Sequence, residues 1–123
     1  MNDSISLNEN PEQFLGVLEL LNTYTKEELK EILQVFNVEV KELMVKLNQN
    51  VDQKNIEAAS YICHQLKGVF LSLNLISLSK LCVEIENKFL SNQLDEVGVS
   101  LKELDSLVLK LLNFLEHQGW FRD

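Results

Sequence analysis

The apolar residues of this chain recur every three or four positions over most of its length. From Leu29 to Leu47 they are spaced 4-3-4-3-4, and from Ile56 to Leu73 they are spaced 3-4-3-4-3. Such spacing places apolar side chains on one face of an α-helix, whereas no segment of useful length alternates as a strand does. The sequence therefore predicts an all-α protein.

Helix-start signals divide the first part of the chain. Asn10-Pro11-Glu12-Gln13 has the pattern of a helix start, with Asn at the N-cap and Pro at the first position, and this short helix is expected to end near Asn22. Thr25-Lys26-Glu27-Glu28 is a capping box that predicts the start of a longer second helix.

Polar residues mark the later turns. Asn48, Asn50 and Asp52 predict the turn after the second helix, with a third helix starting near Asp52. Asn74 stands where the third apolar pattern stops, and Asn tolerates the left-handed backbone conformation found at helix ends. Ser91-Asn92-Gln93 predicts the break between a fourth and a fifth helix.

Four long amphipathic helices with short connections pack best as an antiparallel four-helix bundle, and we expect the short N-terminal helix to cap one end. Trp120 and Phe121, after the last helix, predict an apolar flap on an end of the bundle. The length of 123 residues suits one domain with a real core. We expect a single domain over residues 1–123, with the bundle core at about 25–118, and a monomer.

The charge balance is acidic, with 19 Asp and Glu against 11 Lys and Arg and a net charge of −8. This charge disfavours binding to nucleic acid or to anionic membrane surfaces. No stretch approaches the roughly 18–20 uncharged apolar residues of a membrane span. Residues 1–4 lack the features of a signal peptide. Cys63 and Cys82 lie on apolar stripes, so we expect free core thiols in a cytoplasmic protein.

One short segment combines three residue types that suit phosphate chemistry. His64, Lys67 and Gly68 stand at i, i+3 and i+4 and therefore share one helical face, which borders the core stripe and should reach solvent. Gly in mid-helix costs about 0.5–1 kcal/mol relative to Ala, and here it leaves the approach to the imidazole open. A nucleophilic ring beside a phosphate-binding ammonium fits transient phosphorylation of His64.

His64-Gln65-Leu66-Lys67-Gly68 resembles the H-x-L-K-G motif of histidine phosphotransfer (HPt) domains, and similarity to that family extends over roughly residues 27–115. The resemblance implies that His64 is phosphorylated, that Lys67 neutralises the phosphoryl group, and that Gly68 leaves room for the partner's active site. It further implies a carrier between aspartates of response-regulator receiver domains, with a hybrid sensor histidine kinase as a further candidate partner.

The resemblance also implies no ATP-dependent kinase activity and no cofactor of its own, with Mg²⁺ expected on the partner receiver. The chain agrees in having no Gly-rich phosphate loop. It departs from the family at Val69 and Phe70, where small polar residues are common, and at Asn74, where Gly is common. The first departure leaves the effect on phosphoryl transfer open.

Three further residues near the motif, Tyr61, Gln65 and Leu71, each allow two interpretations. Tyr61 and Leu71 lie on the His64 side and are either an apolar docking rim for a partner or partly buried bundle residues. Gln65 is either solvated or close enough to reach a phosphoryl oxygen. His117, which has no Lys-Gly companion, is expected as a charge at a helix C-terminus.

The sequence leaves one alternative function class open and disfavours another. A helical adaptor that docks a receiver or kinase without carrying phosphate is the alternative, and a buried or blocked His64 ring would favour it. A metal or haem bundle is disfavoured because the chain has no Glu-x-x-His pairs. Residues 58–83 contain no Asp or Glu, only two Lys, so we expect the surroundings of His64 to be free of negative charge.

Overall fold

The structure is a computed structural model that describes residues 12–122. Its elements confirm the prediction of an all-α chain, and no strand occurs within that range. They are α1 (Glu12–Glu19), the 3-10 turn η1 (Leu20–Asn22), α2 (Lys26–Asp52), α3 (Ile56–Ser72), α4 (Ile76–Leu90) and α5 (Leu94–His117).

The capping box at the start of α2 is confirmed. The Glu28 backbone N–H donates to the Thr25 hydroxyl at 3.0 Å, and the Thr25 backbone N–H donates to the Glu28 carboxylate at 2.9 Å. These reciprocal bonds satisfy two N–H groups that a helix start otherwise leaves unpaired. The predicted N-cap of α1, at Asn10 and Pro11, lies outside the described residues.

The predicted turn after α2 is placed too early. Asn48 and Asn50 remain helical, since their side-chain amides donate to backbone carbonyl oxygens one turn earlier, at 2.9 and 2.8 Å. Asp52 is the last residue of α2 rather than the start of α3. The reversal comes at Lys54, which adopts a left-handed φ of 61°, and the Asn55 side chain then accepts from the Ala58 N–H to cap α3.

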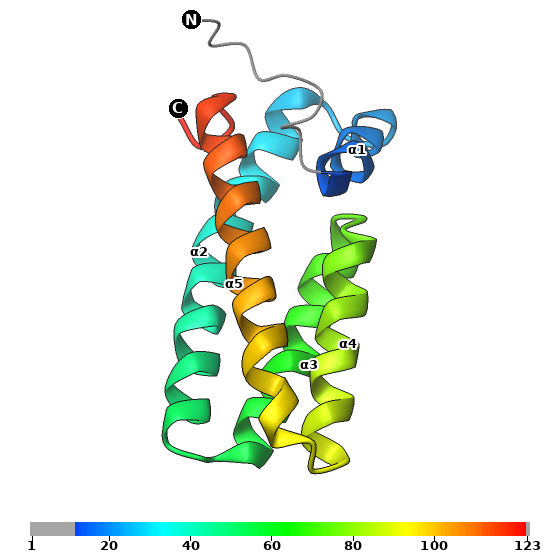
Figure 1. Ribbon diagram of the computed structural model, residues 1–123. Coiled ribbons are helices and arrows are strands. Elements are labelled where there is room, and N and C mark those ends of the chain that lie inside the picture. Colours follow the sequence, from blue (N-terminus) through cyan, green and yellow to red (C-terminus); the bar gives the residue numbers. More distant parts are fainter. Residues whose placement is uncertain (1–11, 123) are drawn as a thin grey trace, which may run out of the picture.

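The later turns lie where the sequence predicts them. Asn74 has a left-handed φ of 59°, and Asn92 has one of 61°. Gly16 of α1 lies against the first of these turns, because a Cβ at that position would collide with the Asn74 carbonyl oxygen. The Asn74 side-chain amide donates to the Gly16 carbonyl oxygen at 3.2 Å. This contact holds α1 on one end of the bundle, as predicted (Figure 1).

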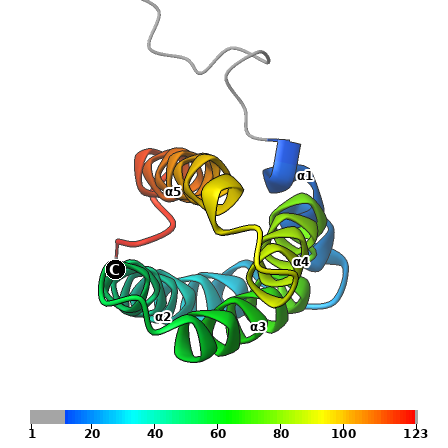
Figure 2. The ribbon, with the colours of Figure 1, turned by 60° about the horizontal axis from the view of Figure 1, so that its bottom comes forward.

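Helices α2 to α5 form an antiparallel bundle in which each helix packs against the next (Figures 1 and 2). The first and last of these helices, α2 and α5, are joined by a side-chain hydrogen bond, in which the Asn48 amide donates to the Asp105 carboxylate at 3.3 Å. Both cysteines are free and fully buried, as predicted. Trp120 is buried and Phe121 packs partly against the core, which confirms the predicted apolar flap at the end of the bundle.

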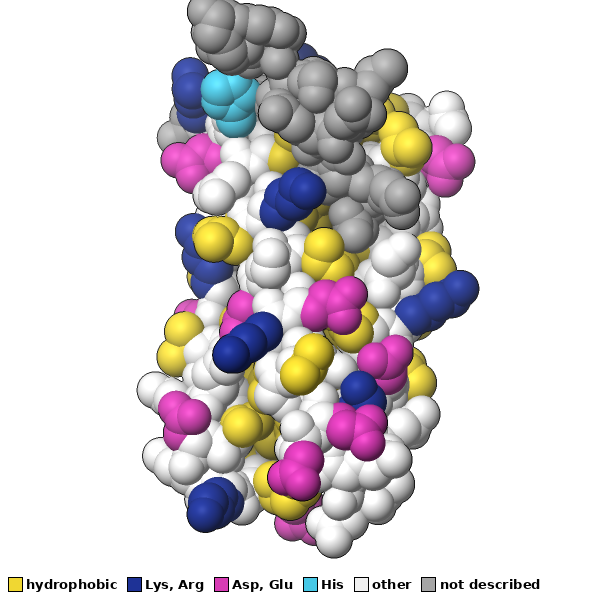
Figure 3. Space-filling model, in the orientation of Figure 1, with side chains coloured by type: hydrophobic (Ala, Val, Ile, Leu, Met, Phe, Trp, Pro, Cys, Tyr) yellow, Lys and Arg dark blue, Asp and Glu magenta, His cyan; other side chains and the backbone are white. Residues whose placement is uncertain are grey.

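The visible surface mixes charges of both signs. Figure 3 shows acidic and basic side chains interspersed with single hydrophobic ones on the face that carries α5 and α4. Within the described part of the chain, no helix has the length and apolar character needed to cross a bilayer. The face seen in Figure 3 therefore mixes charged, polar and single hydrophobic side chains over an apolar core.

Candidate functional site

His64 lies in the middle of α3 with its side chain 57% exposed. Its neighbour Cys63 and the next core residue, Leu66, are fully buried. Because successive helical residues are rotated by about 100°, the position after a core residue lies at the edge of the buried stripe. The prediction that the ring reaches solvent is confirmed, and the buried ring that would have favoured an adaptor is not observed.

Space around the ring is open on the C-terminal side. A Cβ built on Gly68 would meet no heavy atom within 4 Å, so this glycine is not explained by a packing contact among the described residues. Lys67 is half-buried and Gln65 is exposed. All three residues lie in α3 within about one turn of His64, and Lys67 stands at i+3 from it.

Tyr61 and Leu71 are both exposed, by 64% and 46%, rather than partly buried in the bundle. They lie one turn before and two turns after His64 on α3. Single exposed apolar residues are common on protein surfaces. Their position on either side of the ring makes them available to a partner that approaches His64.

The two departures after Gly68 have different environments. Phe70 is fully buried and packs edge-to-face on Phe36, with ring centroids 6.2 Å apart. It therefore points into the core and cannot replace a polar contact at the phosphate. Val69 is half-buried and, with Val35 and Ser72, lines a shallow groove of about 260 Å³ between α2 and α3. Only Val69 changes the accessible surface.

The expected absence of negative charge around His64 is wrong. Glu86 of α4 places Oε1 at 3.7 Å from His64 Nδ1, and its side chain is 22% exposed. This separation is an ion-pair distance for a protonated ring and slightly long for a direct hydrogen bond from a neutral ring. A carboxylate near Nδ1 favours the tautomer that carries its proton there and leaves Nε2 with a lone pair.

The helical hairpin itself carries the signal that could have identified Glu86. His64 lies ten residues before the Asn74 turn and Glu86 lies twelve residues after it. At 1.5 Å per residue, both lie roughly 15–18 Å along antiparallel helices from the same turn. Helix α3 packs closely on α4, so residues at equal distance from their turn come together. Residues 58–83 contain no carboxylate, but Glu86 lies three residues beyond this stretch on the same helix, α4.

The floor of the site contains two neutral thiols. Burial, helped by the neighbouring Cys82 and the Glu86 carboxylate, raises the pKa of Cys63 from 9.0 to about 12. Burial and Glu86 likewise raise the pKa of Cys82 to about 12. Thiols with such pKa values hold their protons at neutral pH and are poor nucleophiles. The nucleophile that reaches solvent at this place is therefore the imidazole.

Other candidate groups do not join the site. His117 is exposed at the C-terminal end of α5, as predicted, and lies on a different helix from His64. Over residues 12–122 no three His, Cys, Asp or Glu side chains gather in a way that could hold a metal ion. The arrangement offers one exposed nucleophile, a carboxylate at its Nδ1 side, and a lysine one turn along.

Comparison with protein families gives one match, a family model described as the Hpt domain, over residues 31–115. The matched range includes most of α2, all of α3 and α4, and α5 nearly to its end. Comparison with curated proteins and with solved structures gave no match. The family match covers more than half of the chain, and it agrees with the helical bundle and with an exposed histidine in mid-helix. The chain therefore belongs to the Hpt domain family.

Proposed function

We propose that this protein is a histidine phosphotransfer carrier and that His64 is its phosphoacceptor. The observation that carries the proposal is the exposed His64 ring beside a glycine with open space above it. Membership of the Hpt family supports transfer between receiver domains in a phosphorelay. No ATP is consumed by the carrier, because the incoming phosphoryl group is already activated as an acyl phosphate.

In the proposed step, the lone pair of His64 Nε2 attacks the phosphorus of a receiver's aspartyl phosphate. The N–P bond forms as the acyl P–O bond breaks, and the aspartate leaves as a carboxylate. The proton on Nδ1 stays on the ring, where Glu86 at 3.7 Å stabilises the positive charge that develops. In the onward step a second receiver's aspartate attacks the phosphohistidine, and the neutral imidazole is regenerated.

Lys67 and Gly68 have separate roles in this mechanism. The Lys67 ammonium neutralises the phosphoryl oxygens, since lysine acts as a point charge on a flexible stem. Gly68 leaves space for the partner's active site, and Gln65 is exposed and close enough in sequence to contact a phosphoryl oxygen. Phosphoryl transfer depends mainly on positioning and charge neutralisation, so these groups suffice on the carrier's side.

We assign Mg²⁺ to the partner receiver rather than to this chain. An acidic magnesium pocket on the receiver supplies the remaining charge neutralisation during transfer. Tyr61 and Leu71, exposed on either side of His64, form the apolar rim against which that receiver docks.

The test is transfer of label from a ³²P-phosphorylated receiver. The wild-type protein should gain an acid-labile, base-stable phosphate, and His64→Gln should gain none. The chain has two histidines, so His117→Gln is the matched control and should label like the wild type. Label on His64→Gln would overturn the assignment. A protein that binds the receiver but accepts no label in any form would instead be a docking adaptor.

A further inference from the structure

A second recess is lined by residues of α1, of the start of α2 and of the segment after α5. These segments lie at the same end of the bundle (Figure 1). Its volume is about 290 Å³, which is at the small end for ligand pockets. It is lined by Phe14, Leu18, Lys26, Lys30, Gln118, Gly119 and Trp120.

The inner wall of this recess is apolar and well fixed. Phe14 and Trp120 are each only 8% exposed. Phe14 packs edge-on against Phe114 of α5, with ring centroids 4.6 Å apart. Gly119, in a left-handed conformation with φ of 86°, turns the chain so that Trp120 folds back on the bundle, and the Trp120 N–H donates to the Leu115 carbonyl at 3.0 Å.

The charged part of the lining is entirely basic. Lys26 and Lys30 stand at i and i+4 on the first turns of α2, so both lie on the same side of the helix. No carboxylate is among the described residues that line the recess. Glu28, which lies between them in sequence, is already engaged by the Thr25 backbone N–H. The recess thus has two lysines in its lining although the chain has a net charge of −8.

A second pocket with apolar walls has charged residues of the opposite sign. The broad depression on the outer face of α2 also has apolar residues, Val35 and Val38, but its charged residues are Glu31, Glu39 and Glu42. Of these two pockets, the recess at the end of the bundle is the one that combines apolar walls with positive charge. Opposite charge attracts over such short distances, so an anion is favoured there.

We propose that this recess binds a small amphiphilic carboxylate, with its apolar body against Phe14, Leu18 and Trp120 and its carboxylate between Lys26 and Lys30. An alkyl carboxylate and an aryl carboxylate share this chemistry. A bound carboxylate contacts α1, α2 and the chain after α5 together and so strengthens the attachment of α1 to the bundle. The proposal does not depend on His64 or on phosphoryl transfer.

Trp120 is the single tryptophan of the chain, so its fluorescence reports the recess directly. The full-length protein is titrated with sodium decanoate and, separately, with 4-phenylbutyrate. A saturable change in emission is expected with at least one of them, and the stronger response identifies the alkyl or the aryl class. Decyltrimethylammonium has a similar tail but the opposite charge, and it should bind at least about tenfold more weakly.

The charge requirement is tested with two variants of equal net charge. Lys26→Gln/Lys30→Gln should weaken binding of the carboxylate at least about tenfold. Lys41→Gln/Lys46→Gln changes two exposed lysines farther along α2 and should leave the affinity within about twofold. Equal loss in both variants, equal affinity for decyltrimethylammonium, or no saturable response to either carboxylate overturns the proposal.

A measurement on the wild-type protein covers the case in which the first variant does not fold. In a ¹H–¹⁵N correlation spectrum, decanoate should shift the backbone amides of Leu18, Gly119 and Trp120 and the Trp120 indole N–H. Shifts centred on residues outside the recess, for example around Val35 and Val38, would show that the carboxylate binds elsewhere and would contradict the assignment.

Discussion

Helix α4 carries polar groups at its interface with α3, the α3–α4 seam, and at its interface with α5, the α4–α5 seam. The polar groups of the two seams have different partners. Toward α3, Glu86 faces the exposed imidazole of His64 at 3.7 Å. Toward α5, Glu84 and Lys88 form a cluster with Ser100. Glu84 and Glu86 are only two residues apart. Glu84 belongs to a hydrogen-bonded cluster between two helices, whereas Glu86 faces the titratable ring of His64.

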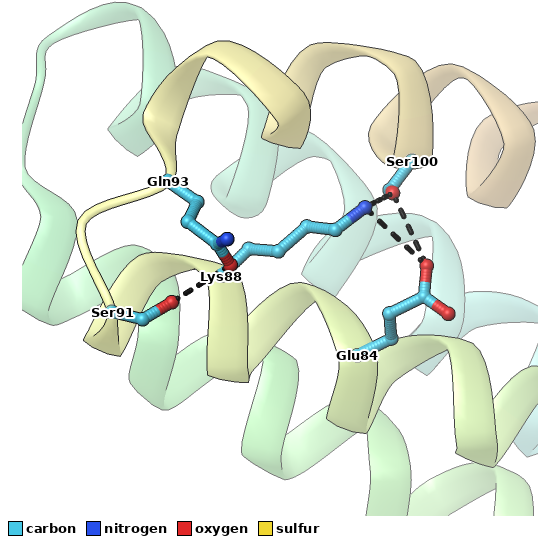
Figure 4. Close-up of polar contacts among 5 residues, drawn as sticks. All are labelled: Glu84, Lys88, Ser91, Gln93 and Ser100. Carbon is cyan, nitrogen blue, oxygen red and sulfur yellow. Dashed lines mark hydrogen bonds and ion pairs between the residues drawn. The ribbon is translucent and has the colours of Figure 1, made fainter.

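In the α4–α5 cluster, Glu84, Lys88 and Ser100 form hydrogen bonds with one another (Figure 4). The Lys88 ammonium donates to the Ser100 hydroxyl at 2.7 Å and to the Glu84 carboxylate at 3.4 Å. The Ser100 hydroxyl donates to the same carboxylate at 3.4 Å. Ser100 is only 2% exposed. Such a cluster links two helices through hydrogen bonds among its own members.

The α3–α4 seam has the opposite character. The thiols of Cys63 and Cys82 are buried in these two helices, and the ion pair of His64 and Glu86 lies where His64 is exposed. The edge pairs a carboxylate with a titratable ring and leaves Lys67 without an ion pair to the described residues. Polar groups whose bonding capacity is unused are the ones that can receive a phosphoryl group. The difference between the seams can be tested residue by residue.

The largest effect is expected from alkaline pH on the α3–α4 seam. The raised pKa of each thiol means that the unfolded chain loses those protons from about pH 9, whereas the folded chain holds them to about pH 12. The free energy of unfolding should therefore fall over this range, by about 1.4 kcal/mol per pH unit for each thiol. Urea unfolding at several pH values measures it. Cys63→Ala/Cys82→Ala should flatten the slope, and an unchanged slope would contradict this explanation.

Lys67→Ala should impair transfer while leaving the fold intact. Loss of a charge-assisted contact raises the transfer barrier by about 1.5–3 kcal/mol, which corresponds to a rate lower by roughly one to two orders of magnitude. The free energy of unfolding should change by less than about 0.5 kcal/mol. Lys80→Ala removes the same charge from exposed α4 and is the control. The rate of phosphoryl transfer is measured for both variants in time courses quenched at short intervals. Equal transfer rates would show that Lys67 has no role in the mechanism.

Lys88→Ala should show the reverse pattern. It removes two hydrogen bonds and leaves the buried Ser100 hydroxyl without its lysine donor, so the free energy of unfolding should fall by about 1–2 kcal/mol. The rate of phosphoryl transfer should remain within about twofold of the wild type, since the cluster lies on the other seam. Lys110→Ala, at an exposed position on α5, controls for the change in charge. Slower transfer without loss of stability would mean that the two seams are not independent.

Glu86 and Glu84 provide the closest comparison. Glu86→Ala should slow transfer by about tenfold because the ring loses the carboxylate whose charge favours a proton on Nδ1. Glu86→Gln should recover part of the rate, since the partial negative charge of an amide oxygen also favours a proton there, and Glu84→Gln should transfer normally. The pH dependence of transfer should differ from wild type for the Glu86 variants alone. Identical profiles for Glu84 and Glu86 variants would argue against a positioning role.

The smallest of the predicted effects is a gain in stability at Gly68. Gly68→Ala should raise the free energy of unfolding by about 0.5–1 kcal/mol, because Ala is the better helix former and its Cβ meets no atom within 4 Å. The same methyl group should slow transfer by crowding the partner. Gly98 of α5 has equally open surroundings, so Gly98→Ala should give the same gain in stability with normal transfer. A destabilised Gly68→Ala would indicate a packing role instead.

Most of the fold could be predicted from the sequence because the helices are regular and their signals are local. The capping box at Thr25 and the left-handed Asn74 are determined by neighbouring residues. The end of α2 was placed too early because Asn48 and Asn50 are usual turn residues, whereas here their amides bond to the preceding helical turn. Sequence composition cannot distinguish these two uses of an asparagine.

The site was predicted only in part for a similar reason. The exposure of His64 follows from its place beside the core stripe of a single helix. Glu86 was missed because its contact with His64 crosses from α3 to α4 and depends on the register of the hairpin. The position of Phe70 in the core, against Phe36, also depends on packing between helices. Contacts within one helix can be predicted from spacing, and contacts between helices require their relative placement.

The most direct measurement is the position of the phosphate on the ring. After phosphorylation by a receiver, two-bond ¹H–¹⁵N correlations of the ¹⁵N-labelled protein distinguish an Nε2-phosphorylated from an Nδ1-phosphorylated imidazole. Phosphate on Nε2 of His64 is expected, because Glu86 lies at 3.7 Å from Nδ1. Phosphate on Nδ1 of His64, on His117, or on no histidine at all would contradict the account.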